Sequence, residues 1–297
     1  MKLGAMIYAA RGAMDIVEFA RVAEQTGFES IWQADHSHRP ITEEERQGWA
    51  DWSLPLHARG HGTLPDLWVI LGAWAAATSE IKIGTAITLV MQRDPIQLAK
   101  EVATADVLSN GRVLFGVGFG HPKPPYTLEM ENHGTNPKQR FGVLRERVLA
   151  MKEIWTQAEP EFHGKYVNFD PMWAEPKPIQ RPHPPILLGS SGGPTRETWD
   201  RRLGWLLEYC DGWFPSFREP DLAERIAELQ SRAAEQGKPP FEISVLWPTE
   251  AAELEERHFD EYAEHGVDRI LFFPPWGPAE EIVPQLERYG ALSTKYA

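Results

Sequence analysis

The chain lacks several features that would assign it to particular classes of protein. It contains a single cysteine, Cys210, which excludes an intrachain disulfide. No run of about 18 apolar residues occurs, so a transmembrane helix is not expected. The opening stretch MKLGAMIYAARGAMD has neither the apolar core nor the cleavage site of a secretory signal. We therefore expect a cytoplasmic protein with no membrane partner.

Positive charge is also scarce. The sequence has 30 Lys and Arg residues against 43 Asp and Glu residues, a formal net charge of −13. Such a balance argues against a nucleic-acid surface and against binding to an anionic membrane. It is still compatible with a small basic pocket for an anionic cofactor.

What the sequence does contain is a regular alternation of apolar runs and amphipathic runs. Short runs rich in Val, Ile, Leu and Phe predict buried strands, and the longer segments between them carry apolar residues at helical spacing. Eight strands are expected, each followed by a helix. They cover Lys2–Tyr8, Glu29–His36, Lys82–Val90, Arg112–Gly120, Pro185–Gly193, Asp211–Ser216, Glu242–Pro248 and Asp268–Pro275.

This pattern predicts an α/β protein. Nearly continuous apolar strands between helices indicate a parallel sheet covered by helices, and eight such units favour a (β/α)8 TIM barrel over a doubly wound sheet. The 297 residues fit one such domain, 1–297. Three segments interrupt the alternation, at about 39–64, 121–137 and 159–184. The first two follow strands two and four, so we expect them to build the carboxyl-terminal rim.

The functional residues of such a barrel are expected where its strands end. The second strand ends in the stretch QADHSHRP, which contains Asp35, His36 and His38. Three interpretations are open for it: a metal site, a general base with a neighbouring acid, or a hydrogen-bonded turn. A zinc site needs three or four ligands, yet only strands two and four supply any, with His121 as the further histidine. We therefore predict no metal.

The remaining strand ends are glycine-rich, apolar or aromatic. That composition suits a flat aromatic ligand lying across the barrel mouth. The fifth strand runs into GSSGG before a helix, which offers backbone N–H groups and hydroxyls to a phosphate. A substrate pocket is expected around His121, after strand four, and Trp247, at the end of strand seven. The residues expected to bind phosphate are Ser190, Ser191, Gly192 and Gly193.

Several segments together resemble the bacterial luciferase-like monooxygenase superfamily, and within it the oxidoreductases that depend on the deazaflavin coenzyme F420. They are VAEQTGFESIWQADH, IKIGTAITLVMQRDPIQLAKEVATADVLSNGRVLFGVGFG, PKPIQRPHPPILLGSSGG and DGWFP. They follow one another in the family's order between Val22 and Pro215, and the block Ile83–Gly120 is the most specific. The family fold is a (β/α)8 barrel, in agreement with the strand count.

The resemblance implies roles for individual residues. His36 would transfer a proton near the reactive edge of the ring, and Asp35 would contact the cofactor. The family often has a non-prolyl cis peptide bond on strand three, behind the ring, which corresponds here to Ala86–Ile87. Gly118 and Gly120 would leave room for the ring, and the loop Ser190–Gly193 corresponds to the family's phosphate site.

The chain also departs from the family pattern. The sugar-phosphate dehydrogenases of this superfamily have a glutamate after the segment GVGxG, whereas this chain has His121. That substrate class, and the acid role of the glutamate, are therefore in doubt. Three basic residues after this point, Lys123, Lys138 and Arg140, are either ligands of an anionic cofactor tail or, more ordinarily, exposed charges.

Three functions follow from the resemblance. The first is hydride transfer between coenzyme F420 and a small organic substrate. The second is a monooxygenase reaction that uses flavin mononucleotide (FMN) as cofactor. The third is a non-catalytic flavin-binding protein. The expected partners are a small-molecule substrate and a second copy of the chain in a homodimer.

Overall fold

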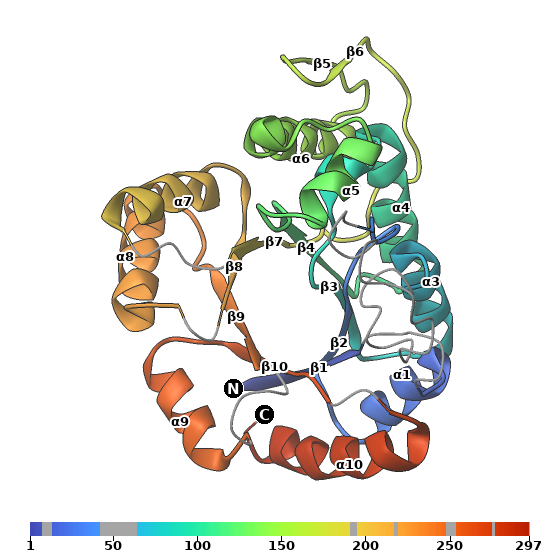
Figure 1. The fold of residues 1–297 in the computed structure, drawn as a ribbon, viewed down its shortest axis with the longest axis vertical. Helices are drawn as coiled ribbons and strands as arrows, with labels where there is room; N and C mark the ends of the chain where they lie inside the picture. The colour runs from blue at the N-terminus through green and yellow to red at the C-terminus, as the bar shows by residue number, and fades with distance from the viewer. Residues whose placement is uncertain are drawn as a thin grey trace.

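Eight parallel strands close into a barrel in the computed structural model of the protein, with helices around the outside (Figure 1). The structure describes residues 1–7, 14–41, 64–190, 195–216, 219–247, 254–274 and 277–296. Around the barrel the strands lie in the order β1-β10-β9-β8-β7-β4-β3-β2. They are β1 (Lys2–Ile7), β2 (Ser30–Gln33), β3 (Lys82–Thr85), β4 (Val113–Gly118), β7 (Ile186–Ser190), β8 (Gly212–Pro215), β9 (Glu242–Trp247) and β10 (Arg269–Phe272).

The predicted (β/α)8 barrel is thus confirmed. Helices follow the strands because their amphipathic sequences cover the outward faces of the sheet. Aspartates cap three of them: Asp15, Asp66 and Asp94 each accept backbone N–H bonds from the first helical turn. The helices are α1 (Ile16–Gln25), α3 (Leu67–Ala77), α4 (Pro95–Leu108), α5 (Tyr126–Asn132), α6 (Arg140–Thr156), α7 (Arg196–Tyr209), α8 (Leu222–Glu235), α9 (Glu256–Glu264) and α10 (Ala279–Tyr296).

The amino-terminal end of the barrel is closed by one large side chain and an ion-pair network. Trp32 is fully buried in the lumen, and a Cβ at Gly84 would lie 2.3 Å from its ring. Arg269 lies over Trp32 at 5.5 Å and donates to Glu29 through Nε and Nη2, both at 2.8 Å. Arg269 also pairs with Glu242. These groups fill the lumen at its amino-terminal end, so among the described residues the space for a ligand lies at the opposite end.

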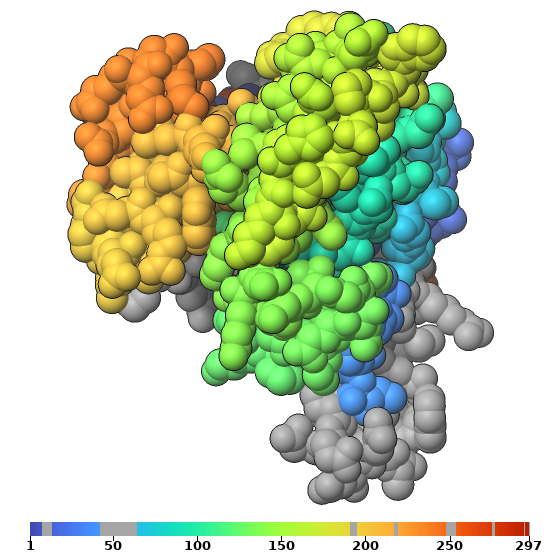
Figure 2. Space-filling model, turned by 90° about the horizontal axis from the view of Figure 1, so that it is seen from above, coloured from blue at the N-terminus to red at the C-terminus, as the bar shows by residue number. Residues whose placement is uncertain are grey.

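The three interruptions of the alternation have different positions. Segment 39–64 lies mostly outside the described residues. Segment 121–137 forms α5 and a 3-10 turn, η3 (Pro137–Gln139), and lies beside the end of β2 (Figure 2). Segment 159–184 contains the small antiparallel pair β5 (Phe162–His163) and β6 (Asn168–Phe169) and lies outside α6 (Figure 1). Only the second of these is described as part of the rim.

Several strands are shorter than predicted, and β3 differs most. The predicted run Lys82–Val90 is mostly apolar, but β3 ends at Thr85. The chain then makes a single bridge at Thr88 and a 3-10 turn, η2 (Val90–Gln92). This change of direction places Ala86 and Ile87 at the mouth of the barrel instead of within its wall.

Some apolar surface is left exposed on two neighbouring helices. Helix α3 is apolar on nearly all sides, yet Val69 on it is 72% exposed. Ile96, Val107 and Leu108 of α4 are exposed as well. The predicted homodimer remains a prediction. No helix among the described residues combines the length and apolar character needed to cross a membrane.

Candidate active site

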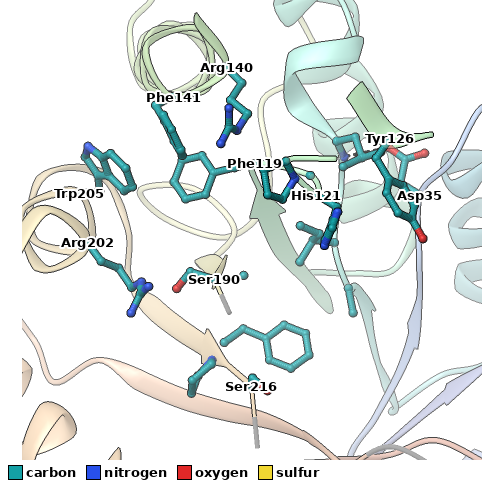
Figure 3. Close-up of a pocket in the computed structure, with 18 of the residues that line it drawn as sticks. Asp35, Phe119, His121, Tyr126, Arg140, Phe141, Ser190, Arg202, Trp205 and Ser216 are labelled. Atoms are coloured by element: carbon teal, nitrogen blue, oxygen red, sulfur yellow. Dashed lines mark hydrogen bonds between the residues drawn. The ribbon is translucent and has the colours of Figure 1, made fainter. Parts of the chain in front are cut away.

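A cavity of about 770 Å³ opens at the carboxyl-terminal ends of the strands (Figure 3). Figure 3 shows Asp35, His121 and Tyr126 on one side of it, and Arg202 and Trp205 on the other. Its lining comprises Ala34, Asp35, His36, Ala86, Ile87, Leu89, Phe119, Gly120, His121, Pro122, Tyr126, Arg140, Phe141, Gly189, Ser190, Thr198, Arg201, Arg202, Trp205, Phe214, Pro215, Ser216 and Leu246. A cavity of this size and mostly apolar lining suits a cofactor or another small organic ligand.

The end of β2 is fixed by a buried ion pair. Asp35 is 5% exposed, and Arg93 donates to both of its carboxylate oxygens, from Nε at 3.0 Å and from Nη2 at 2.8 Å. The backbone N–H of Leu89 donates to the same carboxylate at 3.1 Å. Burial lowers the pKa of the Arg93 guanidinium, but the hydrogen bonds and the charge of Asp35 raise it by more. Asp35 therefore ties β2 to the η2 turn and holds the next residue in place.

That next residue, His36, is paired with a buried acid. Its Nδ1 lies 2.7 Å from Oε2 of Glu129, a residue of α5 that is 1% exposed. Burial raises the pKa of Glu129, but the hydrogen bond and charge of His36 and the Ser37 amide lower it by more, so that it lies below its ordinary value. An ionised acceptor at Nδ1 favours a proton on that nitrogen and leaves Nε2 as the basic atom of the neutral ring.

Outside this pair, a group of polar side chains reaches the surface of the rim. The Ser37 hydroxyl lies 2.8 Å from Nδ1 of His38 and 2.6 Å from Nε2 of His133. Asn132 donates from Nδ2 to Nε2 of His38 at 2.8 Å. His38 is thus part of the rim and does not line the cavity.

The floor of the cavity contains the Ala86–Ile87 peptide bond, which is cis, in agreement with the resemblance. The Ile87 side chain lies against glycines of the two adjoining strands. A Cβ at Gly118 would approach its Cδ1 to 1.8 Å, and a Cβ at Gly189 would approach its Cγ2 to 2.5 Å. Gly118 thus makes room for Ile87, whereas Gly120, with φ of +64°, lines the cavity itself.

Aromatic rings form the wall between β4 and α7. The centroids of Phe119 and Phe141 lie 4.8 Å apart, and Trp205 stacks on Phe141 at 5.0 Å. Arg140 reaches from α6 toward the cavity, with its guanidinium carbon 4.2 Å from the centre of the Phe141 ring (Figure 3). No ion pair of Arg140 occurs within the described ranges, and desolvation lowers its pKa.

The far side of the cavity carries hydroxyls and arginines, and we call Ser190, Thr198, Arg201 and Arg202 the α7 side. Ser190 is buried and accepts a bond from Trp213 Nε1 at 2.9 Å. Arg202 pairs with Glu219 at 3.0 Å, and Arg225 donates to the same carboxylate oxygen. Arg201 pairs with Glu197 at 3.1 Å. The α7 side thus brings guanidinium groups to the cavity, and such groups bind anionic ligands.

The residues predicted for the site are mostly brought together. Asp35, His36, Ala86, Ile87, Gly120, His121 and Ser190 all line the cavity. Trp247 does not, because its ring lies against His258 and Tyr262 of α9, and Leu246 lines the cavity instead. Ser191, Gly192 and Gly193 lie outside the described residues. Within the described part of the chain, no group of three or more His, Cys, Asp or Glu side chains could hold a metal.

Sequence reasoning missed Glu129 and Arg93. Both partners of the Asp35-His36 pair are far from it in the sequence. Arg93 comes shortly after the expected third strand, and Glu129 lies in segment 121–137, where the sequence YTLEMENHG gave no distinct signal. The signal that could have indicated the pair is an acidic residue in an insertion of the rim, because such an insertion can reach a histidine at the end of a neighbouring strand.

Comparison with known proteins extends this picture. Residues 1–252 match the luciferase-like monooxygenase family. An uncharacterized protein of Mycobacterium tuberculosis is 36% identical over 292 residues, covering 98% of each chain. An F420-dependent glucose-6-phosphate dehydrogenase of Amycolatopsis mediterranei is 29% identical, covering 75% of this chain and 64% of that protein. The oxygenase component of a flavin-dependent trigonelline monooxygenase of Acinetobacter baylyi is 26% identical, covering 59% of this chain and 42% of that protein.

Solved structures share the fold. The monooxygenase RslO1 from Streptomyces bottropensis superposes with a TM-score of 0.79 at 18% identity, covering 100% of both chains. The coenzyme F420-dependent tetrahydromethanopterin reductase from Methanopyrus kandleri superposes with a TM-score of 0.69 at 17% identity, covering 97% of both chains.

Proposed function

The chain belongs to the luciferase-like monooxygenase family of oxidoreductases, and from this premise we propose that it transfers a hydride between coenzyme F420 and a small organic substrate. The observation that carries the proposal is the cavity itself. One side presents His36, held by a buried acid, and the other presents hydroxyls and arginines. That combination suits a planar ring at the first side and its anionic tail at the second.

The residues present fit such a cofactor. The Nε of Arg140 is buried and has no hydrogen-bond partner in the described structure, so this cation retains donor capacity beside the cavity. The tail of F420 carries a phosphodiester and carboxylates, which match Arg140 and the α7 side. In a protein of net charge −13, several arginines around one cavity favour a specific anionic ligand there. Ala86, Ile87 and Leu246 would support the apolar ring.

When bound, the deazaflavin supplies the carbon that gives or accepts the hydride. The chain's own part is to hold the substrate and to move a proton. His36 lines the cavity through a ring whose Nδ1 is bonded to Glu129, so Nε2 is the atom that takes a proton from, or gives one to, the substrate oxygen. Glu129 stabilises the imidazolium that forms. Tyr126, 5.7 Å from His36 between ring centres, and His121 enclose this part of the cavity.

A second candidate is a monooxygenase that uses FMN. It is favoured by the flavin-dependent relative from Acinetobacter baylyi. FMN offers one phosphate monoester and no carboxylates, so it would engage the α7 side but not Arg140 as well. The number of arginines around the cavity is the reason for placing F420 first.

The test is a side-by-side titration of the purified protein with oxidised F420 and oxidised FMN, followed by fluorescence. F420 should bind more tightly by tenfold or more, equivalent to about 1.4 kcal/mol. Tighter binding of FMN would contradict the proposal and favour the monooxygenase.

A further inference from the structure

A buried acid holds one of the arginines of the cavity wall. Arg202 lines the cavity, and it donates from Nη1 to Oε1 of Glu219 at 3.0 Å. The Glu219 side chain is fully buried and does not line the cavity. Arg225 of α8, which does not line the cavity either, donates to the same carboxylate oxygen. Glu219 therefore contacts Arg202 from the interior of the protein.

Glu219 is itself fixed from two directions. Its backbone N–H donates to the Ser216 carbonyl at 2.9 Å, and Ser216 lines the cavity directly after β8. Its partner Arg225 lies over the buried ring of Trp199, with 5.4 Å between the guanidinium carbon and the ring centre. An acid tied in this way to a strand end and to a buried ring can hold the long Arg202 side chain in one conformation. A guanidinium fork held at one nitrogen is preorganised for a second partner.

The Ser190 hydroxyl, also on the α7 side, is oriented from behind as well. Trp213 donates from Nε1 to the Ser190 oxygen at 2.9 Å, and an indole N–H can only donate. The Ser190 oxygen therefore accepts this bond, and its own hydrogen is left for an acceptor in the cavity that Ser190 lines. The α7 side thus presents oriented donors, as the binding of a phosphate requires.

We propose that Glu219 is a positioning residue for an anionic cofactor: it orients Arg202 so that the guanidinium donates to a phosphate in the cavity. The proposal rests on the proposed function only in that a phosphate-bearing cofactor occupies the cavity, and both F420 and FMN carry a phosphate. No bond is made or broken in this role. An acid would thus favour the binding of an anion, which is the reverse of what its charge alone predicts.

This reversal of sign distinguishes orientation from simple electrostatics. Glu219→Gln keeps the size of the side chain and removes its negative charge. If Glu219 acted only through its charge, the substitution would tighten the binding of an anion. If Glu219 orients Arg202, the substitution weakens binding, because a neutral amide oxygen holds a guanidinium less firmly than a carboxylate does. Burial raises the pKa of Glu219 and both arginines oppose that effect, so binding is measured at pH 8, well above the ordinary 4.5.

The test is the dissociation constant of oxidised F420 and of oxidised FMN, each followed by fluorescence, for four proteins. They are the unmodified chain, Glu219→Gln, Arg202→Gln and the double variant. Glu219→Gln should weaken binding by about fivefold or more, and Arg202→Gln by at least as much. In the double variant the change at Glu219 should add nothing, because no guanidinium remains to be oriented. The single-turnover rate at saturating cofactor should stay the same.

Two further variants keep the test sharp. Arg202→Lys retains the charge but not the two-sided fork, so it should weaken binding by about threefold or more even where Glu219→Gln folds poorly. Glu228→Gln is the matched control, because Glu228 is an acid of α8 that pairs at 2.6 Å with Arg196 of α7, and Arg196 does not line the cavity. Its cofactor affinity should equal that of the unmodified protein.

Three results would overturn the role of Glu219. They are tighter or unchanged binding in folded Glu219→Gln, a further loss of affinity in the double variant, and full affinity in Arg202→Lys. The proposed function is decided by which cofactor binds more tightly, whereas the role of Glu219 is decided by how the affinity for the tighter one changes. Either can therefore fail while the other stands.

Discussion

The two sides of the barrel mouth hold their charges in different ways. On the β2 side, defined by Asp35, His36, Arg93 and Glu129, the acids and bases are paired with one another inside the protein. On the α7 side, Arg202 and Arg225 share Glu219, and nearby Arg140 has no ion pair among the described residues. Internal pairing fixes geometry, which catalysis needs, whereas guanidinium groups beside a cavity attract an anionic ligand. We therefore expect the β2 side to govern turnover and the α7 side with Arg140 to govern cofactor affinity.

The largest expected effect comes from removing the reactive group of the β2 side. His36→Ala should lower the single-turnover rate with F420 by ~10²–10⁴-fold, because the proton transfer loses its acid or base. Cofactor affinity should change little, and His38→Ala, at the exposed rim, should have a much smaller effect. A well-folded His36→Ala enzyme with full activity would contradict the claim that the β2 side governs turnover.

A second substitution, at Glu29, tests whether the closed end of the barrel contributes to stability. Burial raises the pKa of Glu29, but the ion pair with Arg269 lowers it by more, from the ordinary 4.5 to about 2. A lowered pKa means that the stabilisation is complete above pH 4.5 and is lost as the pH falls toward about 2. Glu29→Gln should therefore lower the free energy of unfolding at pH 7 by up to ~3 kcal/mol.

Chemical denaturation of Glu29→Gln and the unmodified protein at pH 7, 4 and 2.5 measures this effect. The difference between the two proteins should shrink as the pH falls. Affinity for F420 should stay the same, since Glu29 lies at the closed end of the lumen. A difference that grows in acid would show that the sign assigned to this group is wrong.

The affinity half of the comparison is tested at Arg140. Arg140→Gln should weaken F420 binding by about tenfold, or about 1.4 kcal/mol, with little change in the single-turnover rate at saturating cofactor. Arg145→Gln is the matched control, because Arg145 lies on the same helix but pairs with Glu208 on the exposed outside. A loss of turnover without a loss of affinity would place Arg140 with the catalytic residues instead.

The smallest expected effect is the pH dependence of the β2 side. The bonds from His36 and Ser37 lower the pKa of Glu129 against the opposing effect of burial, so its contribution to stability is present above pH 4.5 and is lost as the pH falls below that value. Melting temperatures of Glu129→Gln and the unmodified protein should therefore converge in acid. Arginines do not titrate there, so a similar convergence for Arg140→Gln would contradict the contrast between the two sides.

Much of the barrel could be predicted because its information is local. Apolar runs such as KLGAMI and RILF indicate buried strands, and the barrel geometry then brings their ends to one face. This pattern predicts Asp35 and His36 at the mouth of the barrel, where both line the cavity, while their roles stay predictions. The position of the cis bond at Ala86–Ile87 comes from the resemblance to a family, since nothing in the residue pattern of KIGTAITLV indicates it.

Two kinds of feature could not be predicted from the sequence. One depends on partners distant in the sequence, and the other depends on which face of a strand each side chain occupies. Glu129 meets His36 across 93 positions of sequence, through a helix inserted after β4. Successive residues of a strand face opposite sides, so Leu246 faces the cavity and Trp247 faces α9. In an apolar strand that is buried on both faces, the sequence does not indicate which residues face the lumen and which face the helices.

The glycines behind the cavity restrict how this enzyme could be redesigned. A Cβ at Gly116 would lie 1.9 Å from the Thr85 carbonyl oxygen, and one at Gly118 would lie 1.8 Å from Ile87. A side chain at Gly116 would require the backbone of β3 to move, and one at Gly118 would require the Ile87 side chain to leave its place in the floor of the cavity. A mutant library aimed at new substrates should therefore leave these floor positions unchanged and vary the rim, where Tyr126 and His121 line the cavity.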